Sequence, residues 1–245
     1  MKKLVLLFCL LSLVISGCNK NEAPSVIKVA VCPTSPPNMF EENGKYQGID
    51  LELFEGFCQA RGREFQITAY DWQGMIDAIT GGKADVAFSA ISITEKRKEI
   101  MDFSQPYMDN TWNLVSMKKR NIKIDDLAQL KKYTIGYPQG MAYSTFISDN
   151  LEPKGIYKLS AVKMYPTYKE VLADLMNGKL DLAFLDGSVA SVQKKKMDIQ
   201  DSYVFTGFDA FGFAFAKGSP LRDDFNKYLT ELGTEKLKAI IGKWL

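Results

Sequence analysis

GGKADVAFSAISITEKR, residues 81–97, carries the clearest structural signal in this chain. A glycine turn leads into the apolar run 86–88, which is typical of a buried strand, and a helix then begins with Thr94 as a suitable N-cap. Main-chain N–H groups at such a strand-to-helix junction are unpaired and carry partial positive charge. Arg97 adds a planar fork of donors that matches two carboxylate oxygens. The stretch therefore predicts a carboxylate site, although Arg97 can also be an ordinary solvated helix residue.

A second stretch, NGKLDLAFLDG at residues 177–187, repeats this pattern. Both stretches have a glycine turn that ends a helix, then a lysine, then a short strand that ends in a polar residue. Strand and helix patterns alternate from residue 26 onward, which favours mostly parallel sheets covered by helices. We therefore expect two similar α/β lobes. Since ligands bind at the carboxyl ends of strands in open parallel sheets, the polar strand ends should face each other across a cleft.

The remaining elements follow from apolar periodicity and turn residues. A final pair of amphipathic helices within 219–245 should bury Leu229, Leu232, Leu237 and Ile240 as core. Segment 111–119 has the pattern of an extended connector. The expected strands are 26–32, 64–70, 83–90, 133–137, 180–185 and a run within 209–220, and the expected helices are 48–62, 72–82, 125–132, 141–150, 168–178 and 187–196.

The first residues, MKKLVLLFCLLSLVISGC, have the pattern of a secretory signal. Two lysines precede an apolar run that is too short for a membrane span of about 20 residues, and small residues then precede Cys18. Residues 15–18 resemble the bacterial lipobox, so we expect residues 1–17 to be a lipoprotein signal peptide and Cys18 to be lipidated (palmitate). Residues 18–25 would then form a tether. The mature protein would be extracytoplasmic, in the periplasm or at the cell surface, and lipid-anchored to the membrane.

Composition restricts the chemistry. The chain has 31 Lys and Arg against 29 Asp and Glu; without Lys2 and Lys3 the charge is zero, and we expect no nucleic-acid partner. The chain has no histidine, which removes the commonest general base and most zinc sites, so we expect no catalytic residue, cofactor or metal. Cys32 and Cys58 would share an oxidising compartment, where a disulfide between them is allowed but not required.

Four motifs resemble, in order, the bacterial extracellular solute-binding proteins of the amino-acid type (family 3), the receptors of ABC importers. The motifs are SPPNMFEENGKYQGIDLEL (35–53), WQGMIDAITGGKADV (72–86), ISITEKR (91–97) and MDFSQPY (101–107). The resemblance implies an α/β, two-lobed, periplasmic-binding-protein-like fold of type II. Lobe I would contain residues 26–111 and 208–245, and lobe II residues 112–207, with a two-strand hinge and a ligand cleft between them.

The resemblance also implies site residues. Arg97 would bind the α-carboxylate of an amino acid, together with the main-chain N–H groups of Ser92 and Ala142. Asp186, the carbonyl of Ala90 and the hydroxyl of Ser92 would receive the α-ammonium. One fixed cation and one fixed anion on opposite lobes match a zwitterion. Asp186 can also act as a helix N-cap ahead of residues 187–189.

The expected side-chain pocket departs from the family pattern. Cys32 stands where receptors for basic amino acids tend to carry an acid, and Trp72 lies where the family has an aromatic that stacks on the ligand, although a core role for Trp72 is an alternative. The pocket would be neutral and rather apolar, which favours a neutral L-amino acid; an amide could still be hydrogen-bonded. The residues expected at or near the pocket are Cys32, Asn38, Trp72, Ser89, Gln139, Met141 and Tyr143.

Three further readings of the chain stay open. A cyclohexadienyl-dehydratase-like enzyme resembles the same fold and would need a general acid in the cleft, for which only Asp186 is a candidate. A ligand-presenting sensory lipoprotein and a scaffold protein without a ligand are the others. The receptor reading predicts a non-enzymatic monomer whose partners are a small amino acid, the permease of an ABC importer and, through the lipid, the membrane.

Overall fold

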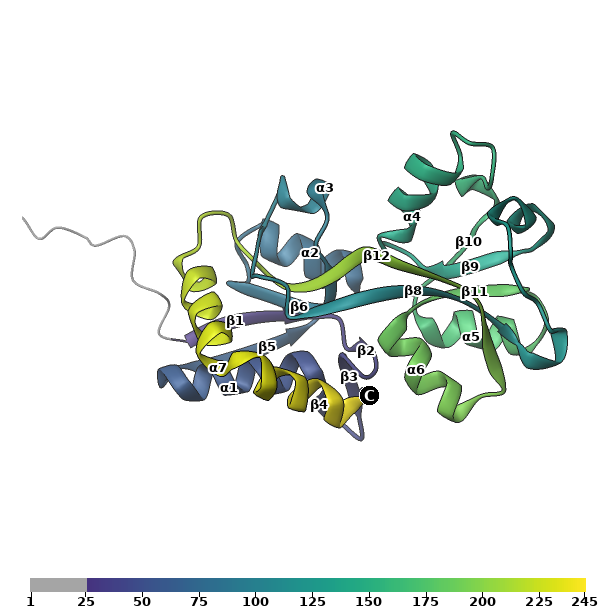
Figure 1. Ribbon diagram of the computed structural model, residues 1–245. Coiled ribbons are helices and arrows are strands. Elements are labelled where there is room, and N and C mark those ends of the chain that lie inside the picture. The colour runs from purple at the N-terminus through teal and green to yellow at the C-terminus, as the bar shows by residue number, and fades with distance from the viewer. Residues whose placement is uncertain (1–25) are drawn as a thin grey trace, which may run out of the picture.

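The computed structural model describes residues 26–245, and the ribbon forms two lobes joined by two long strands (Figure 1). The expected signal peptide, Cys18 and the tether lie outside the described residues. The joining strands are β8 (Met108–Met117) and β12 (Ile199–Phe215), which pair antiparallel through both lobes. Within residues 26–245 no helix is long and apolar enough to cross a membrane.

The first lobe is built from the N-terminal elements and the last helix. Its strands are β1 (Val26–Val31), β2 (Thr34–Ser35), β3 (Met39–Glu42), β4 (Lys45–Gln47), β5 (Glu64–Ala69), β6 (Val86–Ser92) and β7 (Asp102–Phe103). Its helices are α1 (Ile49–Arg61), α2 (Trp72–Thr80), α3 (Glu95–Lys98) and α7 (Pro220–Trp244). Strand β6 is buried along its whole length, as its apolar sequence predicts for a central parallel strand.

The second lobe is built from the middle of the chain. Its strands are β9 (Ile135–Pro138), β10 (Lys163–Tyr165) and β11 (Leu182–Asp186), and its α-helices are α4 (Tyr143–Phe146), α5 (Tyr168–Met176) and α6 (Gly187–Lys196). It also contains the 3-10 helices η1 (Lys118–Arg120), η2 (Leu127–Lys132) and η4 (Leu159–Ala161) and the π-helix η3 (Ile147–Leu151). Helix α5 begins at a capping box formed by Thr167 and Glu170.

The two lobes share one sheet. Its strand order is β10-β9-β11-β8-β12-β6-β1-β5, with β7 on β12. The outer pairs in each lobe are parallel, whereas β11/β8, β8/β12 and β12/β6 are antiparallel. The expected α/β fold with mostly parallel lobes is confirmed. The antiparallel centre follows from strands β8 and β12, which cross between the lobes in opposite directions.

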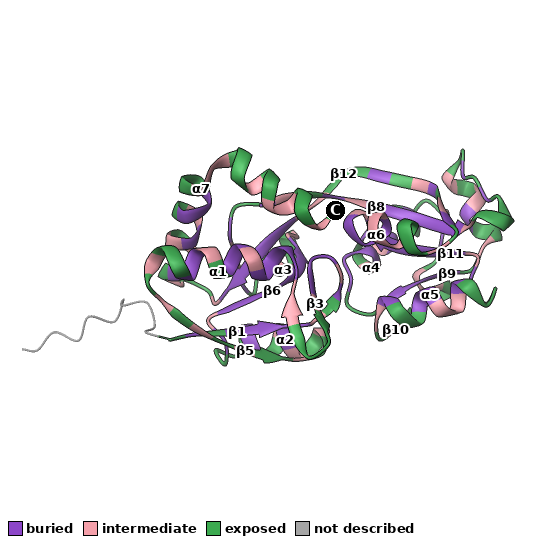
Figure 2. Ribbon diagram, turned by 90° about the horizontal axis from the view of Figure 1, so that it is seen from below, coloured by how far each residue is buried: buried purple, intermediate pink, exposed green. Residues whose placement is uncertain are grey.

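Separate cores lie in the two lobes, and Figure 2 shows buried residues along the central strands of both. The core of the second lobe draws its buried residues from Trp112 to Phe205. The two core clusters of the first lobe draw theirs from residues 27–107 and 211–229. Leu229 is buried, and Leu232, Leu237 and Ile240 pack against the same core, which confirms their expected role.

Several elements differ from the predictions in detail. The helices expected at 125–132 and 141–150 are confirmed, but the first is the 3-10 helix η2 and the second is the short α4 continued by the π-helix η3. Residues 34–47 form a small antiparallel sheet that was not predicted. Strand β12 begins at Ile199, ten residues earlier than expected. The final pair of helices is confirmed, because Gly233 breaks α7 with a non-helical φ of 76°.

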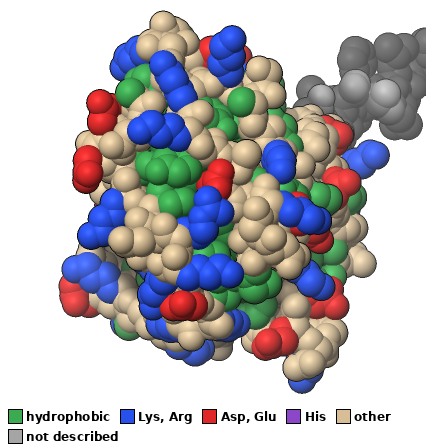
Figure 3. Space-filling view, turned by 90° about the vertical axis from the view of Figure 1, so that its right-hand side faces the viewer, with side chains coloured by type: hydrophobic (Ala, Val, Ile, Leu, Met, Phe, Trp, Pro, Cys, Tyr) green, Lys and Arg blue, Asp and Glu red, His purple; other side chains and the backbone are tan. Residues whose placement is uncertain are grey.

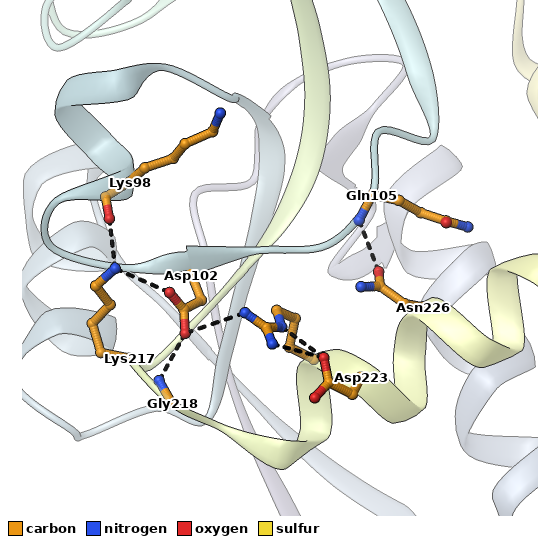
Figure 4. Close-up of polar contacts among 8 residues, drawn as sticks. Lys98, Asp102, Gln105, Lys217, Gly218, Asp223 and Asn226 are labelled. Atoms are coloured by element: carbon orange, nitrogen blue, oxygen red, sulfur yellow. Dashed lines mark hydrogen bonds and ion pairs between the residues drawn. The ribbon is translucent and has the colours of Figure 1, made fainter.

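One polar cluster joins β7 to the start of α7 (Figure 4). The Asp102 carboxylate accepts hydrogen bonds from Lys217 Nζ at 3.0 Å and from the main-chain N–H of Gly218 at 2.7 Å. Arg222 lies 3.6 Å from the same carboxylate. These contacts hold the last helix against the edge of the sheet and lower the pKa of Asp102, although burial opposes that shift.

Candidate functional site

Arg97 lies at the boundary between the lobes. Thr94 caps α3 as predicted, because its hydroxyl accepts from the main-chain N–H of Arg97 at 3.2 Å. The guanidinium donates to the carbonyl of Ser92 at 2.9 Å and, across the cleft, to that of Gly140 at 3.0 Å. It also lies over the ring of Trp72, 5.2 Å from the centroid. Burial lowers its pKa to about 10, so it stays charged at neutral pH.

The end of β6 is irregular next to Arg97. Ala90 has a left-handed φ of 52°, and the pairing of β12 with β6 shifts register opposite it. The main-chain N–H of Ala90 donates to the buried carboxylate of Asp50 at 2.7 Å, and that carboxylate also accepts from Tyr107 at 2.5 Å. Burial raises the pKa of Asp50 to about 7. Asp50, which the sequence analysis did not single out, therefore fixes the backbone from which Ala90 and Ser92 extend.

The side chain of Ser89 is hydrogen-bonded to the main chain of Cys32. The Ser89 hydroxyl accepts from the main-chain N–H of Cys32 at 2.9 Å and donates to the carbonyl of Cys32 at 2.9 Å. The Cys32 thiol contacts the hydroxyl of Thr34 at 3.4 Å, and burial raises its pKa. Cys32 and Cys58 are both buried and free, so the structure contains no disulfide between them.

Asp186 ends β11 and is 2% exposed. Its carboxylate accepts from Asn110 at 2.8 Å, Tyr143 at 2.6 Å and Tyr168 at 2.8 Å. It occupies the N-cap position of α6, but its side chain makes no capping hydrogen bond, so the capping alternative is wrong for the side chain. Burial raises its pKa to about 6, and the charge of Asp209 adds to that rise. Tyr143, which is 1% exposed, therefore orients this carboxylate.

Asp209 is the main site feature that the sequence analysis missed. Its Oδ2 accepts from the Ser92 hydroxyl at 2.9 Å, Asn110 Nδ2 at 2.7 Å and Trp112 Nε1 at 2.8 Å. Burial raises its pKa, while these hydrogen bonds and the charge of Arg97 oppose the rise. The only sequence signal was an acid at the start of an apolar strand-like run, and its partners come from distant segments.

Trp72 lines two cavities. A narrow one of about 10 Å³ is lined by both lobes, and its lining contains no charged side chain: Cys32, Thr34, Ser35, Trp72, Pro138, Gln139, Met141, Pro166, Thr167 and Tyr168. A wider one of about 310 Å³ is lined by Trp72, Arg97 and neighbours from α2 and α3, and by Gly140, Met141, Ala142 and others from the second lobe. The structure therefore brings Cys32, Trp72, Gln139, Met141 and Ala142 to the boundary between the lobes.

Asn38 bridges the lobes at another point. It is fully buried, and its Nδ2 donates to the hydroxyl of Ser188 at 2.7 Å. Its Oδ1 has no hydrogen-bond partner, and no other buried side-chain nitrogen or oxygen among residues 26–245 shares this condition. Asn38 lines neither cavity described above. An unpaired buried acceptor is costly, so Asn38 is suited to accept a hydrogen bond from a further group in the cleft.

These features define a class of protein: a two-lobed α/β binding protein with opposed charged groups at the boundary between its lobes. The profile of the bacterial extracellular solute-binding proteins, family 3, matches residues 27–245, and the chain belongs to that family.

Individual relatives are similar over most of their length. The chain is 30% identical to the histidine-binding periplasmic protein of Salmonella typhimurium, across 93% of this chain and 87% of the relative. It is 29% identical to the probable amino-acid-binding protein YxeM of Bacillus subtilis, across 93% and 88%. Among solved structures, an ancestral arginine-binding protein bound to arginine superposes with a TM-score of 0.80 at 28% identity, across 91% of this chain and 99% of that chain.

Proposed function

We propose that this chain is an extracytoplasmic receptor that binds a neutral L-amino acid between its lobes and delivers it to the permease of an ABC importer. The observation that carries the proposal is the placement of Arg97 on one lobe and Asp186 on the other. The family resemblance assigns the α-carboxylate to Arg97 and the α-ammonium to Asp186, and groups of opposite charge on two lobes suit a zwitterion. Family membership and the amino-acid-binding functions for which the relatives are named support the receptor class and favour binding over catalysis.

The neutral ligand is argued from the side chains that line the two cavities beside Trp72. Neither lining contains a carboxylate, and the only charged side chains in the wider one are the cations Lys96 and Arg97. A basic side chain buried there would lack a counter-charge, and an isolated buried charge is strongly unfavourable. Relatives named for histidine and arginine therefore need not share their ligand with this chain.

The hinge and the lobes are proposed as follows. Lobe I contains residues 26–111 and 208–245, and lobe II contains residues 112–207. Strands β8 and β12 cross between the lobes near Asn110 and Asp209, where the pairing of β12 shifts register between Phe205 and Asp209. An irregular pairing on two crossing strands suits a hinge. We also propose lipidation at Cys18, a signal peptide at residues 1–17 and a monomeric protein.

A thermal-shift screen of residues 19–245 against the twenty L-amino acids tests the function. The protein is first unfolded and refolded to remove any bound metabolite. A ligand at 1,000 times its Kd adds about 4 kcal/mol of stability, so a true ligand gives a large shift. A large shift with one neutral amino acid is expected. A shift only with lysine or arginine overturns the neutral assignment, and no shift with any of the twenty overturns the amino-acid receptor.

A further inference from the structure

A hydrogen-bonded cluster, the hub, links strands β8 and β12 to the ligand site. The hub consists of Ser92, Asn110, Trp112, Asp186 and Asp209. Asp209 and Asn110 face each other in the ladder between β12 and β8. The amide nitrogen of Asn110 donates to Asp209 Oδ2 at 2.7 Å and to Asp186 Oδ1 at 2.8 Å. Its carbonyl oxygen accepts from the main-chain N–H of Gly187 at 3.1 Å. Both amide hydrogens are thus in use, and the two carboxylate oxygens lie within about 5.5 Å of each other because they share one donor.

The hub determines which way the Ser92 hydroxyl points. Asp209 Oδ2 accepts from Ser92, Asn110 and Trp112 together. Trp112 is 5% exposed, and its ring stacks on that of Phe208 at 6.3 Å, which holds this donor in place. A hydroxyl has one hydrogen, and Ser92 gives it to Asp209, so only the lone pairs of Ser92 are left for another partner.

The charges around this point favour a cation. The carboxylates of Asp186 and Asp209 have no ion pair within 4.0 Å among the salt bridges of residues 26–245. Arg97 donates to carbonyl oxygens instead. A group that binds here would meet acceptors from Ser92, Asp186 and Asp209. An ammonium satisfies three acceptors, whereas a hydroxyl has only one hydrogen to give.

We propose that Asp209 is a positioning residue that makes the ligand site select an α-amino group over an α-hydroxyl group. It does so through Ser92, whose hydrogen it holds away from the ligand, and through its own negative charge beside Asp186. The inference rests on the proposed amino-acid receptor function and adds a determinant on the hinge strand. The chemical class selected is therefore L-amino acids, in preference to 2-hydroxy acids with the same side chain.

Asp209→Asn tests the proposal because it removes the charge and keeps an acceptor for Ser92, Asn110 and Trp112. The probes are the L-amino acid that stabilises the wild-type protein most among the twenty and the 2-hydroxy acid with the same side chain. Calorimetry is expected to show at least about a tenfold loss of affinity for the amino acid and less than about a threefold change for the hydroxy acid. Equal losses for both probes would overturn the proposal, because a merely structural role weakens both alike.

A double-mutant cycle provides a second readout with the amino acid alone. Ser92→Ala and Asp209→Asn are combined, and their losses are expected to be less than multiplicative because Asp209 acts partly through Ser92. Multiplicative losses would show that Asp209 does not act through Ser92. This readout decides the question even where the hydroxy acid binds too weakly to measure.

Asp201→Asn is the matched control. Asp201 lies on the same strand, and its carboxylate likewise accepts from an asparagine of β8, Asn113, at 2.8 Å, but it takes no part in the hub. The Asp201→Asn variant should bind the amino acid and the hydroxy acid with unchanged affinity. A wild-type protein that binds none of the twenty amino acids refutes the receptor function itself. Wild-type binding together with an unaffected Asp209→Asn variant refutes only the role of Asp209.

Discussion

Arg97 lies where the two lobes meet, with hydrogen bonds from its guanidinium to both of them. Its sequence context predicts a carboxylate site, and the structure places its guanidinium against Gly140 of the other lobe and over Trp72. The planar fork is fixed on one side by the carbonyl of Ser92. A fork held in this way loses little conformational freedom when it binds a carboxylate.

Arg97→Ala is expected to weaken amino-acid binding by at least about 30-fold, because loss of a partly buried charged hydrogen-bond partner costs about 2–5 kcal/mol. Isothermal titration calorimetry measures the loss. Lys98→Ala is the control, since Lys98 is exposed, lies on the same short helix and lines neither cavity beside Trp72; it should keep its affinity within about twofold. Unchanged binding in Arg97→Ala would refute the carboxylate assignment.

Asp186 predicts a pH dependence of stability. Its folded pKa of about 6 lies above its ordinary value of 3.8, mainly because of burial. The folded state therefore binds the proton more tightly than the unfolded state, and the contribution of this group to stability falls as pH rises from about 4 to about 6. Such a rise in pKa corresponds to about 3 kcal/mol.

Asp186→Asn removes this titration and keeps a polar side chain among the same partners. Urea denaturation at several pH values should show the stability of the variant, relative to wild type, increasing between pH 4 and pH 7. Amino-acid binding should be lost. A stability difference that does not vary with pH would contradict the raised pKa of Asp186.

At the level of elements, the position of α7 depends on the Asp102 cluster (Figure 4). Asp102 has 17% of its side chain exposed and holds Lys217, Gly218 and Arg222. Its pKa is lowered, so its contribution to stability is present above its unfolded pKa and is lost as pH falls through the folded value.

Asp102→Ala is expected to reduce the free energy of unfolding by about 1–3 kcal/mol at pH 7, because the main-chain N–H of Gly218 loses its acceptor and two cations lose their partner. The difference from wild type should shrink as pH falls below 4. Asp223→Ala is the control, since Asp223 has 69% of its side chain exposed and pairs only at the surface with Arg222. Equal destabilisation by both variants would contradict the anchoring role of Asp102.

The two lobes carry net charges of opposite sign. With the proposed boundaries, lobe II has 14 basic and 10 acidic residues, and lobe I has 14 basic and 18 acidic residues. Figure 3 shows the end of the second lobe, where Lys and Arg side chains are spread over the surface. Lobes with net charges of +4 and −4 attract each other, and salt screens such attraction over about 8–10 Å.

Closure around a ligand should therefore weaken with salt. Affinity for the amino-acid ligand is expected to fall several-fold between about 10 mM and about 500 mM NaCl. A variant with Lys194, Lys195 and Lys196 replaced by Gln lowers the charge of lobe II and should show a smaller dependence. The same salt dependence in both proteins would show that the effect does not come from the charges of the lobes.

Local features of this protein were predictable from neighbours in the chain. The alternation of strands and helices, the Thr94 cap and the final pair of amphipathic helices depend on side chains a few residues apart, through hydrogen bonds and apolar periodicity. The stretch 81–97 pointed to Arg97, and the repeated pattern at 177–187 pointed to Asp186. These features follow from backbone geometry that each segment adopts by itself.

Tertiary structure decided which distant groups meet. Ser92 and Asp209 are 117 residues apart, and Asn110 and Asp209 are 99 apart. Their contact depends on the register of β8 against β12 and on the shift beside Asp209. A one-residue slip turns every side chain to the other face of a sheet, so no local pattern reveals such a contact. For the same reason the continuous sheet, the hydrogen bonds of Asp186 and the bridge from Asn38 to Ser188 appear only when the two lobes are assembled.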